Sequence, residues 1–293
     1  MTRTDPTIRL APTDRVAVLA GSGRLPVNVI EGLAASGHEP FVVLIGGEAD
    51  DDPRLTAHDH ATLELENFGG LVSLLKANRV THVVMAGGIG RRPSWWRMRI
   101  TPAFLSVAAK ALYGLSRGDD GLLRTIVRAF EGKGFKVVGA HEIVPDLLTP
   151  EGRLTRAGPT AADRRDLDAA WVAAQAIGAL DIGQGAIAIG GRVIALEGIE
   201  GTDGLLERTK ALRSHGRLAS AKRGVLVKCA KPGQELRADL PAIGPATIDG
   251  AHAAGLAGVG VEAGRSLILD HGAMIARADA LGLFVVGLSS DAR

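Results

Sequence analysis

The feature that most constrains the fold is a repeated pattern: a short apolar run, then glycines, then a stretch suited to a helix. Val16–Ala20, Phe41–Ile45 and residues 80–85 are such runs, and each has the length and composition of a buried β-strand. Because strands that alternate with helices form parallel sheets, the sequence predicts an α/β fold with helices on both faces of the sheet.

The second half of the chain alternates in a less regular way. Gly185–Ile189 and Arg192–Leu196 flank the pair Gly190-Gly191, a strong signal for a two-residue β-hairpin. Since hairpin strands are antiparallel, we expect a second α/β domain with a mixed sheet. The predicted order is a flexible leader (residues 1–14), an N-terminal Rossmann-like domain (15–147), a linker (148–159) and a C-terminal domain (160–293), with the active site between the two domains.

Composition restricts the class of protein. The 293 residues are 46% hydrophobic and include 39 glycines, which is typical of soluble α/β enzymes. The formal net charge of +2 gives no reason to expect a nucleic-acid partner. The single cysteine, Cys229, excludes an internal disulfide and fits a reducing compartment. No apolar signal-peptide core or membrane-spanning stretch is evident, so we expect a cytoplasmic protein.

Glycine-rich loops follow three of the predicted strands, with the sequences GSGRLP, GGIGRRP and GAHE. Backbone N–H groups in such loops can approach a phosphate. The predicted substrate-binding residues here are Gly21, Ser22, Gly23, Arg24, Leu25, Gly88 and Arg91. As a dinucleotide fingerprint the first loop is incomplete, because Pro26 stands where a third glycine is expected. A nicotinamide-dependent oxidoreductase built on Gly21–Gly23 is an alternative, although the missing third glycine counts against it.

A polar loop after residues 224–227 is the main candidate for chemistry. It carries Lys228, Gln234, Arg237 and Asp239, and the prolines within it prevent a regular helix. Lys228 and Arg237 could neutralise a phosphoryl group in the transition state, and Asp239 could activate water. The alternative is a surface loop in which Arg237 and Asp239 pair locally.

Acidic residues end several predicted strands of the second half, and carboxylates at adjacent strand ends can converge on a metal ion. The predicted ligands of Mg²⁺ (or Mn²⁺) are Glu200, Asp203, Asp239 and Glu262. Each has a structural alternative: Thr202-Asp203 could cap a helix, and Glu262 could pair with Arg265. Asp119, in Gly118-Asp119-Asp120-Gly121, could likewise bind substrate or cap a helix. Because Walker A, GxSxG and HExxH motifs are absent, a phosphate ester or anhydride fits best.

The chain resembles the UDP-2,3-diacylglucosamine pyrophosphatases of lipid A biosynthesis, in the branch with a DUF1009-type C-terminal domain. The likeness runs from about residue 16 to 286, and its sharpest parts are AGSGRLP, GAHEIVP, DIGQ, EGIEGTD, KCAKPGQELRADLPAIG and VEAG. One departure is GDDGLL at residues 118–123, where a DDALL-like form is typical.

The resemblance implies an activity and its site. Such enzymes hydrolyse the pyrophosphate bond of UDP-2,3-diacylglucosamine to UMP and 2,3-diacylglucosamine 1-phosphate (lipid X), with a divalent metal and water. On this model the glycine loops, Asp119 and Thr202 help hold substrate, and Asp239, Lys228 and Gln234 are catalytic. Residues 102–115 could contact acyl chains or form a core helix. We also expect transient contact with the inner-membrane leaflet and a homodimer. A non-catalytic nucleotide-sugar or lipid carrier is a further alternative.

Overall fold

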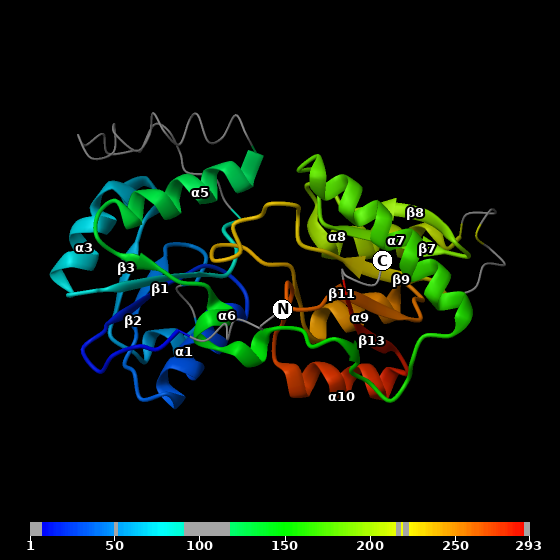
Figure 1. The fold of residues 1–293 in the computed structure, drawn as a ribbon, viewed down its shortest axis with the longest axis horizontal. Coiled ribbons are helices and arrows are strands. Elements are labelled where there is room, and N and C mark those ends of the chain that lie inside the picture. Colours follow the sequence, from blue (N-terminus) through cyan, green and yellow to red (C-terminus); the bar gives the residue numbers. More distant parts are fainter. Residues whose placement is uncertain (1–7, 50–51, 91–117, 215–217, 219–222, 290–293) are drawn as a thin grey trace. The chain divides into compact units, whose positions relative to one another are not determined.

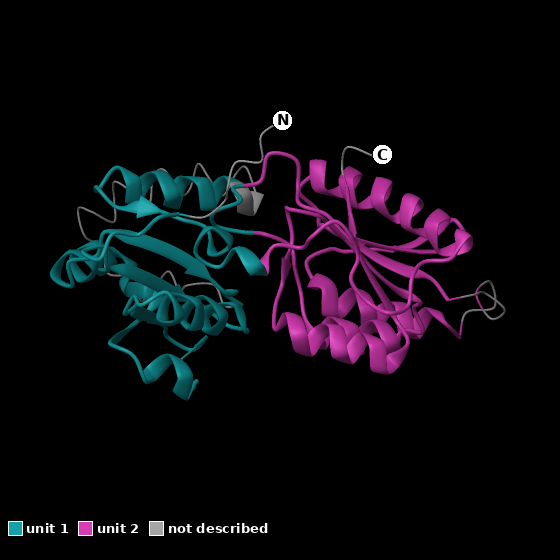
Figure 2. Cartoon of the chain, turned by 60° about the horizontal axis from the view of Figure 1, so that its bottom comes forward, with its two compact units in different colours: residues 1–146, 235–239 teal, residues 147–234, 240–293 magenta. Residues whose placement is uncertain are grey.

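The computed structural model describes residues 8–49, 52–90, 118–214, 218 and 223–289. The chain forms two compact units (Figure 2). Unit 1 comprises Met1–Asp146 and Glu235–Asp239, and unit 2 comprises Leu147–Gln234 and Leu240–Arg293. We call Glu235–Asp239 the return segment, because it comes from the second half of the chain but belongs to unit 1.

Unit 1 has a five-stranded parallel sheet in the order β3-β2-β1-β4-β5. This is the strand order of a Rossmann-type nucleotide-binding half with two further strands. The strands are β1 (Val16–Ala20), β2 (Phe41–Ile45), β3 (His60–Leu63), β4 (His82–Ala86) and β5 (Lys136–Val137). The predicted α/β class is confirmed. β3 was not predicted, because it lies at the sheet edge and its exposed His60 and Thr62 break the apolar pattern of a strand.

The helices of unit 1 cover both faces of this sheet (Figure 1). Val127 and Phe130 of α5 pack with the strand residues Leu19 and Val43 in one core cluster, and α1 lies on the opposite face. The helices are α1 (Leu25–Ala35), α2 (Pro53–Thr56), η1 (Leu65–Gly70), α3 (Leu71–Ala77), α5 (Gly118–Glu131), α6 (Ala140–Ile143) and η3 (Pro145–Leu147).

Unit 2 has a six-stranded mixed sheet in the order β6-β13-β11-β9-β7-β8 and a two-stranded pair, β10-β12. β9, β11 and β13 are parallel, whereas β6, β7 and β8 are each antiparallel to their neighbours. The strands are β6 (Gly152–Arg153), β7 (Gly185–Ile189), β8 (Arg192–Leu196), β9 (Val225–Lys228), β10 (Ala242–Ile243), β11 (Gly258–Glu262), β12 (Leu267–Ile268) and β13 (Phe284–Leu288).

Strand periodicity divides the core of unit 2 between the two faces of its sheet. Ala186 and Val225 belong to one core cluster, which also contains the apolar residues of α7. Ile187 and Leu226 belong to a second cluster. The helices are α7 (Ala161–Ala179), α8 (Gly201–Leu212), α9 (Pro245–Ala253) and α10 (His271–Leu281). Thr160 caps α7, and the φ angles of +64° at Gly190 and +78° at Gly191 close the predicted hairpin.

The segment predicted as a linker, residues 148–159, belongs to unit 2. There β6 pairs with β13, and Leu148 forms a β-bridge with Leu267. Its prolines and glycines suggested a connector, but two residues of extended chain are enough to add an edge strand. Within the described ranges, no helix has both the length and the apolar character needed to cross a membrane.

Candidate functional site

The loops after β1 and β4 meet where the strand order of unit 1 reverses, the usual ligand site of such sheets. The amide of Ser22 donates to the carbonyl of Gly88 at 2.8 Å, and the amide of Gly88 donates back at 3.0 Å. The Ser22 hydroxyl also donates to the Gly88 carbonyl, at 3.0 Å. Three predicted substrate-binding residues, Gly21, Ser22 and Gly88, are thus brought together.

Glycine is required at two positions of the first loop. The carbonyl oxygen of Gly88 occupies the space that a Cβ atom on Gly21 would need. Gly23 has a φ of +95°, in the region that favours glycine. Arg24 is the N-cap residue of α1, and Leu25 begins that helix directly after the loop.

A cavity of about 220 Å³ opens beside this loop, lined by Gly21, Gly23, Gly47, Glu48, Ala49, Asp52 and Leu55. Glu48 accepts a hydrogen bond from the amide of Gly90 at 2.7 Å, and Asp52 accepts one from the amide of Arg54 at 3.0 Å. Arg54 also donates from its side chain to both oxygens of Asp52, at 2.9 and 2.6 Å, so Glu48 is the carboxylate here that suits a hydroxyl of a sugar. The sequence analysis did not single out these two acids. Glu48 could have been found from its position just after the second strand, where Rossmann folds carry the acid that binds ribose.

The return segment places Asp239 in unit 1. Ala238 packs against the unit 1 core cluster, and the amide of Asp239 donates to the carbonyl of Glu235 at 3.1 Å. The Cα atom of Arg237 lies close to Gly139, where an added Cβ would be 3.3 Å away. Since Gly139 follows β5, the segment lies by the carboxyl end of that strand, on the sheet edge where the glycine loops also emerge.

Arg237 is engaged by two carboxylates. Its Nε and Nη2 donate to the two carboxylate oxygens of Glu235 at 2.8 and 3.0 Å, and its Nη1 donates to Glu131 at 2.6 Å. The hydrogen bond from Arg237 lowers the pKa of Glu235, and Glu235 in turn raises the pKa of Arg237. The sequence predicted that Arg237 binds substrate. Its position instead suits the attachment of the return segment, and Glu131 was not foreseen.

The GAHE motif is mainly structural in this conformation. Glu142 accepts a hydrogen bond from the amide of Gly139 at 2.6 Å and so closes the first turn of α6. Burial lowers the pKa of His141, which keeps its imidazole neutral near pH 7. Both residues also belong to the carboxyl end of β5.

In unit 2, two predicted catalytic residues are buried, one as the last residue of β9 and one in the loop that follows it. Lys228 is 6% exposed, and its Nζ donates to the carbonyl of Ala242 at 2.9 Å. Gln234 is 7% exposed, and its side-chain oxygen accepts from the amide of Lys231 at 2.8 Å. Both side chains therefore brace the loop after β9.

The carboxylate predictions in unit 2 fall on residues with structural partners. Glu262 is buried at the end of β11, where it accepts from the amide of Ala230 at 2.8 Å and lies 3.4 Å from Arg265. Thr202 donates to the buried Glu197 at 2.9 Å. The Thr202 hydroxyl thus fixes a carboxylate.

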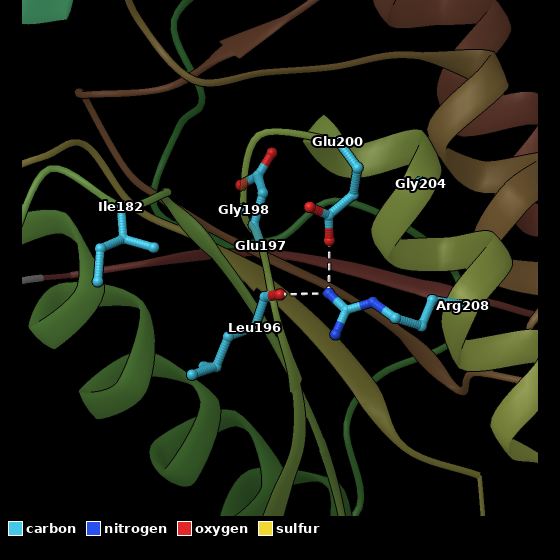
Figure 3. Close-up of a pocket in the computed structure, with 7 residues that line it drawn as sticks. All are labelled: Ile182, Leu196, Glu197, Gly198, Glu200, Gly204 and Arg208. Carbon is cyan, nitrogen blue, oxygen red and sulfur yellow. Dashed lines mark hydrogen bonds and ion pairs between the residues drawn. The ribbon is translucent and has the colours of Figure 1, made fainter. Parts of the chain in front are cut away.

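Glu200 is the N-cap residue of α8 and lines an open groove of about 630 Å³ (Figure 3), and Asp203 lies in the first turn of that helix. Arg208 donates to Glu200 at 2.5 Å and to the carbonyl of Leu196, also at 2.5 Å. The pKa of Glu200 is lowered by a hydrogen bond from the backbone amide of Glu200 itself and by the contact with Arg208. Asp203 is exposed. The groove is lined by Ile182, Leu196, Glu197, Gly198, Glu200, Gly204 and Arg208.

These carboxylates do not form a metal centre within one unit. Among the described residues, no group of three or more His, Cys, Asp and Glu side chains is arranged to hold a metal ion. Asp239 belongs to unit 1, whereas Glu200, Asp203 and Glu262 belong to unit 2. The predicted ligand set therefore stays a prediction.

Arg91 and the acyl-chain candidate, residues 102–115, lie outside the described residues. Asp119 falls in the first turn of α5, but its side chain is not described.

Comparisons with known proteins cover nearly the whole chain. Residues 15–147 match the family model "LpxI N-terminal domain", and residues 150–286 match "LpxI C-terminal domain". The chain is 40% identical over 280 residues to the UDP-2,3-diacylglucosamine pyrophosphatase LpxI of Caulobacter vibrioides, covering 95% of this chain and 99% of that protein. A solved isoflavone reductase aligns with 95% of this chain and 80% of its own, at 10% identity and a TM-score of 0.26, which is too low to support any inference.

Proposed function

The chain belongs to the LpxI family, and we propose on this basis that it is a UDP-2,3-diacylglucosamine pyrophosphatase, a hydrolase of lipid A biosynthesis. The observation that carries the proposal is the 40% identity to a named enzyme over 95% of the chain. The predicted family likeness is thereby confirmed. The likeness to a pyrophosphatase favours the hydrolase over the oxidoreductase alternative.

The proposed reaction splits one phosphoric anhydride. The oxygen of a water molecule bonds to the phosphorus on the uridine side, and the bond from that phosphorus to the bridging oxygen breaks. The bridging oxygen leaves with the sugar phosphate, and a base takes up the proton of the water. The products are UMP and 2,3-diacylglucosamine 1-phosphate. No redox partner is needed.

Unit 1 supplies groups suited to binding the substrate and to orienting the attacking water. The N–H of Gly23, just before α1, can hold a phosphate, and the cavity carboxylate Glu48 can bind a hydroxyl of a sugar. Asp239, held in the return segment, is the candidate for orienting the attacking water. Lys228 and Gln234 bind to backbone groups of unit 2, at Ala242 and Lys231.

Three finer points are also proposed. The enzyme uses Mg²⁺ or Mn²⁺, since a diphosphate is poorly neutralised without a cation. It contacts the inner leaflet of the membrane transiently, because its substrate carries two acyl chains. It forms a homodimer. Vesicle flotation and analytical ultracentrifugation test the last two: retention on the membrane after a high-salt wash, or a purely monomeric species, would count against them.

The test of the activity is release of UMP from UDP-2,3-diacylglucosamine, with formation of the sugar 1-phosphate followed in the same sample. We expect both products in equal amounts, and no turnover by Asp239→Ala above about a hundredth of the wild-type rate. A protein that binds the substrate without releasing UMP would be the carrier considered as an alternative.

A further inference from the structure

We propose that Glu131 and Arg237 are positioning residues for Asp239: their ion pair holds the return segment against unit 1 in the geometry that the reaction needs. The proposal rests on the proposed function for its link to turnover. It assigns Arg237 to a different task from the phosphate contact that the sequence predicted. It also gives a role to Glu131, a residue that no motif singled out.

The ion pair joins distant parts of the sequence. Glu131 is the last residue of α5, and its carboxylate accepts from Nη1 of Arg237 at 2.6 Å, across 106 residues of chain. The other side of the guanidinium is fixed by the bidentate contact with Glu235. A planar guanidinium can bridge two carboxylates in this way, whereas the point charge of a lysine cannot.

The same contacts make Arg237 a poor site for the substrate. Nε, Nη1 and Nη2 each donate to a carboxylate oxygen, and the three side chains together carry a net charge of −1. A diphosphate would have to displace a carboxylate to reach the guanidinium. Arg237 is therefore occupied with the protein itself.

Packing completes the attachment. Next to Arg237, Ala238 packs against the unit 1 core cluster, and Gly139 allows the backbone of Arg237 to approach closely. The amides of Ala238 and Asp239 both donate to the carbonyl of Glu235, at 3.0 and 3.1 Å. The segment is a single compact turn, so a shift of the Arg237 side chain is passed to Asp239 two residues later.

Position matters more here than stability. An ion pair whose side chains are 33% and 42% exposed contributes little to folding, so its loss leaves the protein folded. A displacement of about 1 Å at a catalytic group, however, can lower turnover on the order of 100-fold. The two effects can therefore be separated by experiment.

The experiment compares Glu131→Gln with wild type in steady-state UMP release. We expect kcat to fall at least about 10-fold while KM changes less than about 2-fold, because position is lost rather than binding. Glu131→Asp, which keeps the charge on a shorter side chain, should recover part of kcat. The control is Asp249→Asn, which breaks the exposed 2.6 Å ion pair with Arg277 and should change neither constant.

Two outcomes would overturn the proposal. If Arg237 binds substrate directly, Glu131→Gln would free it, and kcat would be kept or KM would fall. In an Asp239→Asn background, Glu131→Gln should cause no further loss; losses that multiply would show that Glu131 does not act through Asp239.

Hydrogen exchange gives a measure that does not depend on activity. In Glu131→Gln the amides of Ala238 and Asp239 should exchange faster, and in Asp249→Asn they should not. Unchanged exchange in Glu131→Gln would reject the positioning role. If wild type releases no UMP, the proposed function fails, and the exchange result still decides whether Glu131 holds the segment.

Discussion

The carbonyl oxygen of Gly88 fills the space in which a Cβ atom on Gly21 would lie, so the loops after β1 and β4 can meet only when residue 21 is glycine. We predict that Gly21→Ala forces the two loops apart. The free energy of unfolding should fall by about 1–3 kcal/mol, the usual cost of overpacking, and KM should rise. Urea denaturation and UMP release check this.

The matched control for that substitution is Gly272→Ala, in the first turn of α10, where an added Cβ meets no atom within 4 Å. Its stability should be unchanged or raised by up to about 1 kcal/mol, because alanine favours the helix. Equal losses in both variants would contradict the close-contact argument.

Asp239 is expected to be essential. Asp239→Ala should lower turnover at least about 100-fold, the scale for losing an acid–base group, and Asp239→Asn should be nearly as impaired because the charge is lost. Circular dichroism and substrate binding should stay close to wild type, since the residue lies outside the core. An alanine variant that keeps more than about a tenth of the activity would refute the role.

Metal removal tests the cation proposal. EDTA should abolish UMP release, and Mg²⁺ or Mn²⁺ should restore it, because a cation neutralises the diphosphate. The rates are measured before and after dialysis, with metal content checked by mass spectrometry. Full turnover in a sample free of divalent metal would exclude the requirement.

His82 predicts how stability depends on pH. Burial lowers its pKa from 6.5, although Asp14 at 3.7 Å opposes the shift and Lys136 adds to it. Below pH 6.5 the unfolded chain therefore binds protons that the folded chain resists, so stability falls as the pH falls from 7 toward 5. His82→Gln should flatten this slope in urea titrations. Identical slopes for the two proteins would show that His82 does not contribute.

Continuous apolar strands were the most predictable part of the fold. β1, β2 and β7 occur at the residues predicted, because buried apolar runs next to glycines have few alternatives, and β8 does so because the Gly190-Gly191 turn fixes it opposite β7. β3 and β6 were missed since both lie at sheet edges, where polar residues and very short pairing leave little pattern.

The candidate site was predictable only where it is local in sequence. The Gly21 loop and Asp239 stand out by their residue types, and the structure places both in unit 1. The pairing of Arg237 with Glu131 was not predictable, because neither residue belongs to a motif with the other and contacts at such separation depend on the finished fold. For Glu200 and Thr202 the structure adds partners, Arg208 and Glu197, that the sequence did not indicate.

The return segment also bears on how the protein is made. The chain passes from one unit to the other at residues 146–147, 234–235 and 239–240. Domains generally fold in order as they leave the ribosome, but unit 1 lacks a piece of itself until residue 239 has emerged. In a fragment that stops at residue 147, Glu131 of α5 would lack its partner Arg237 in the return segment. The N-terminal half is therefore completed only after most of its successor has been synthesised.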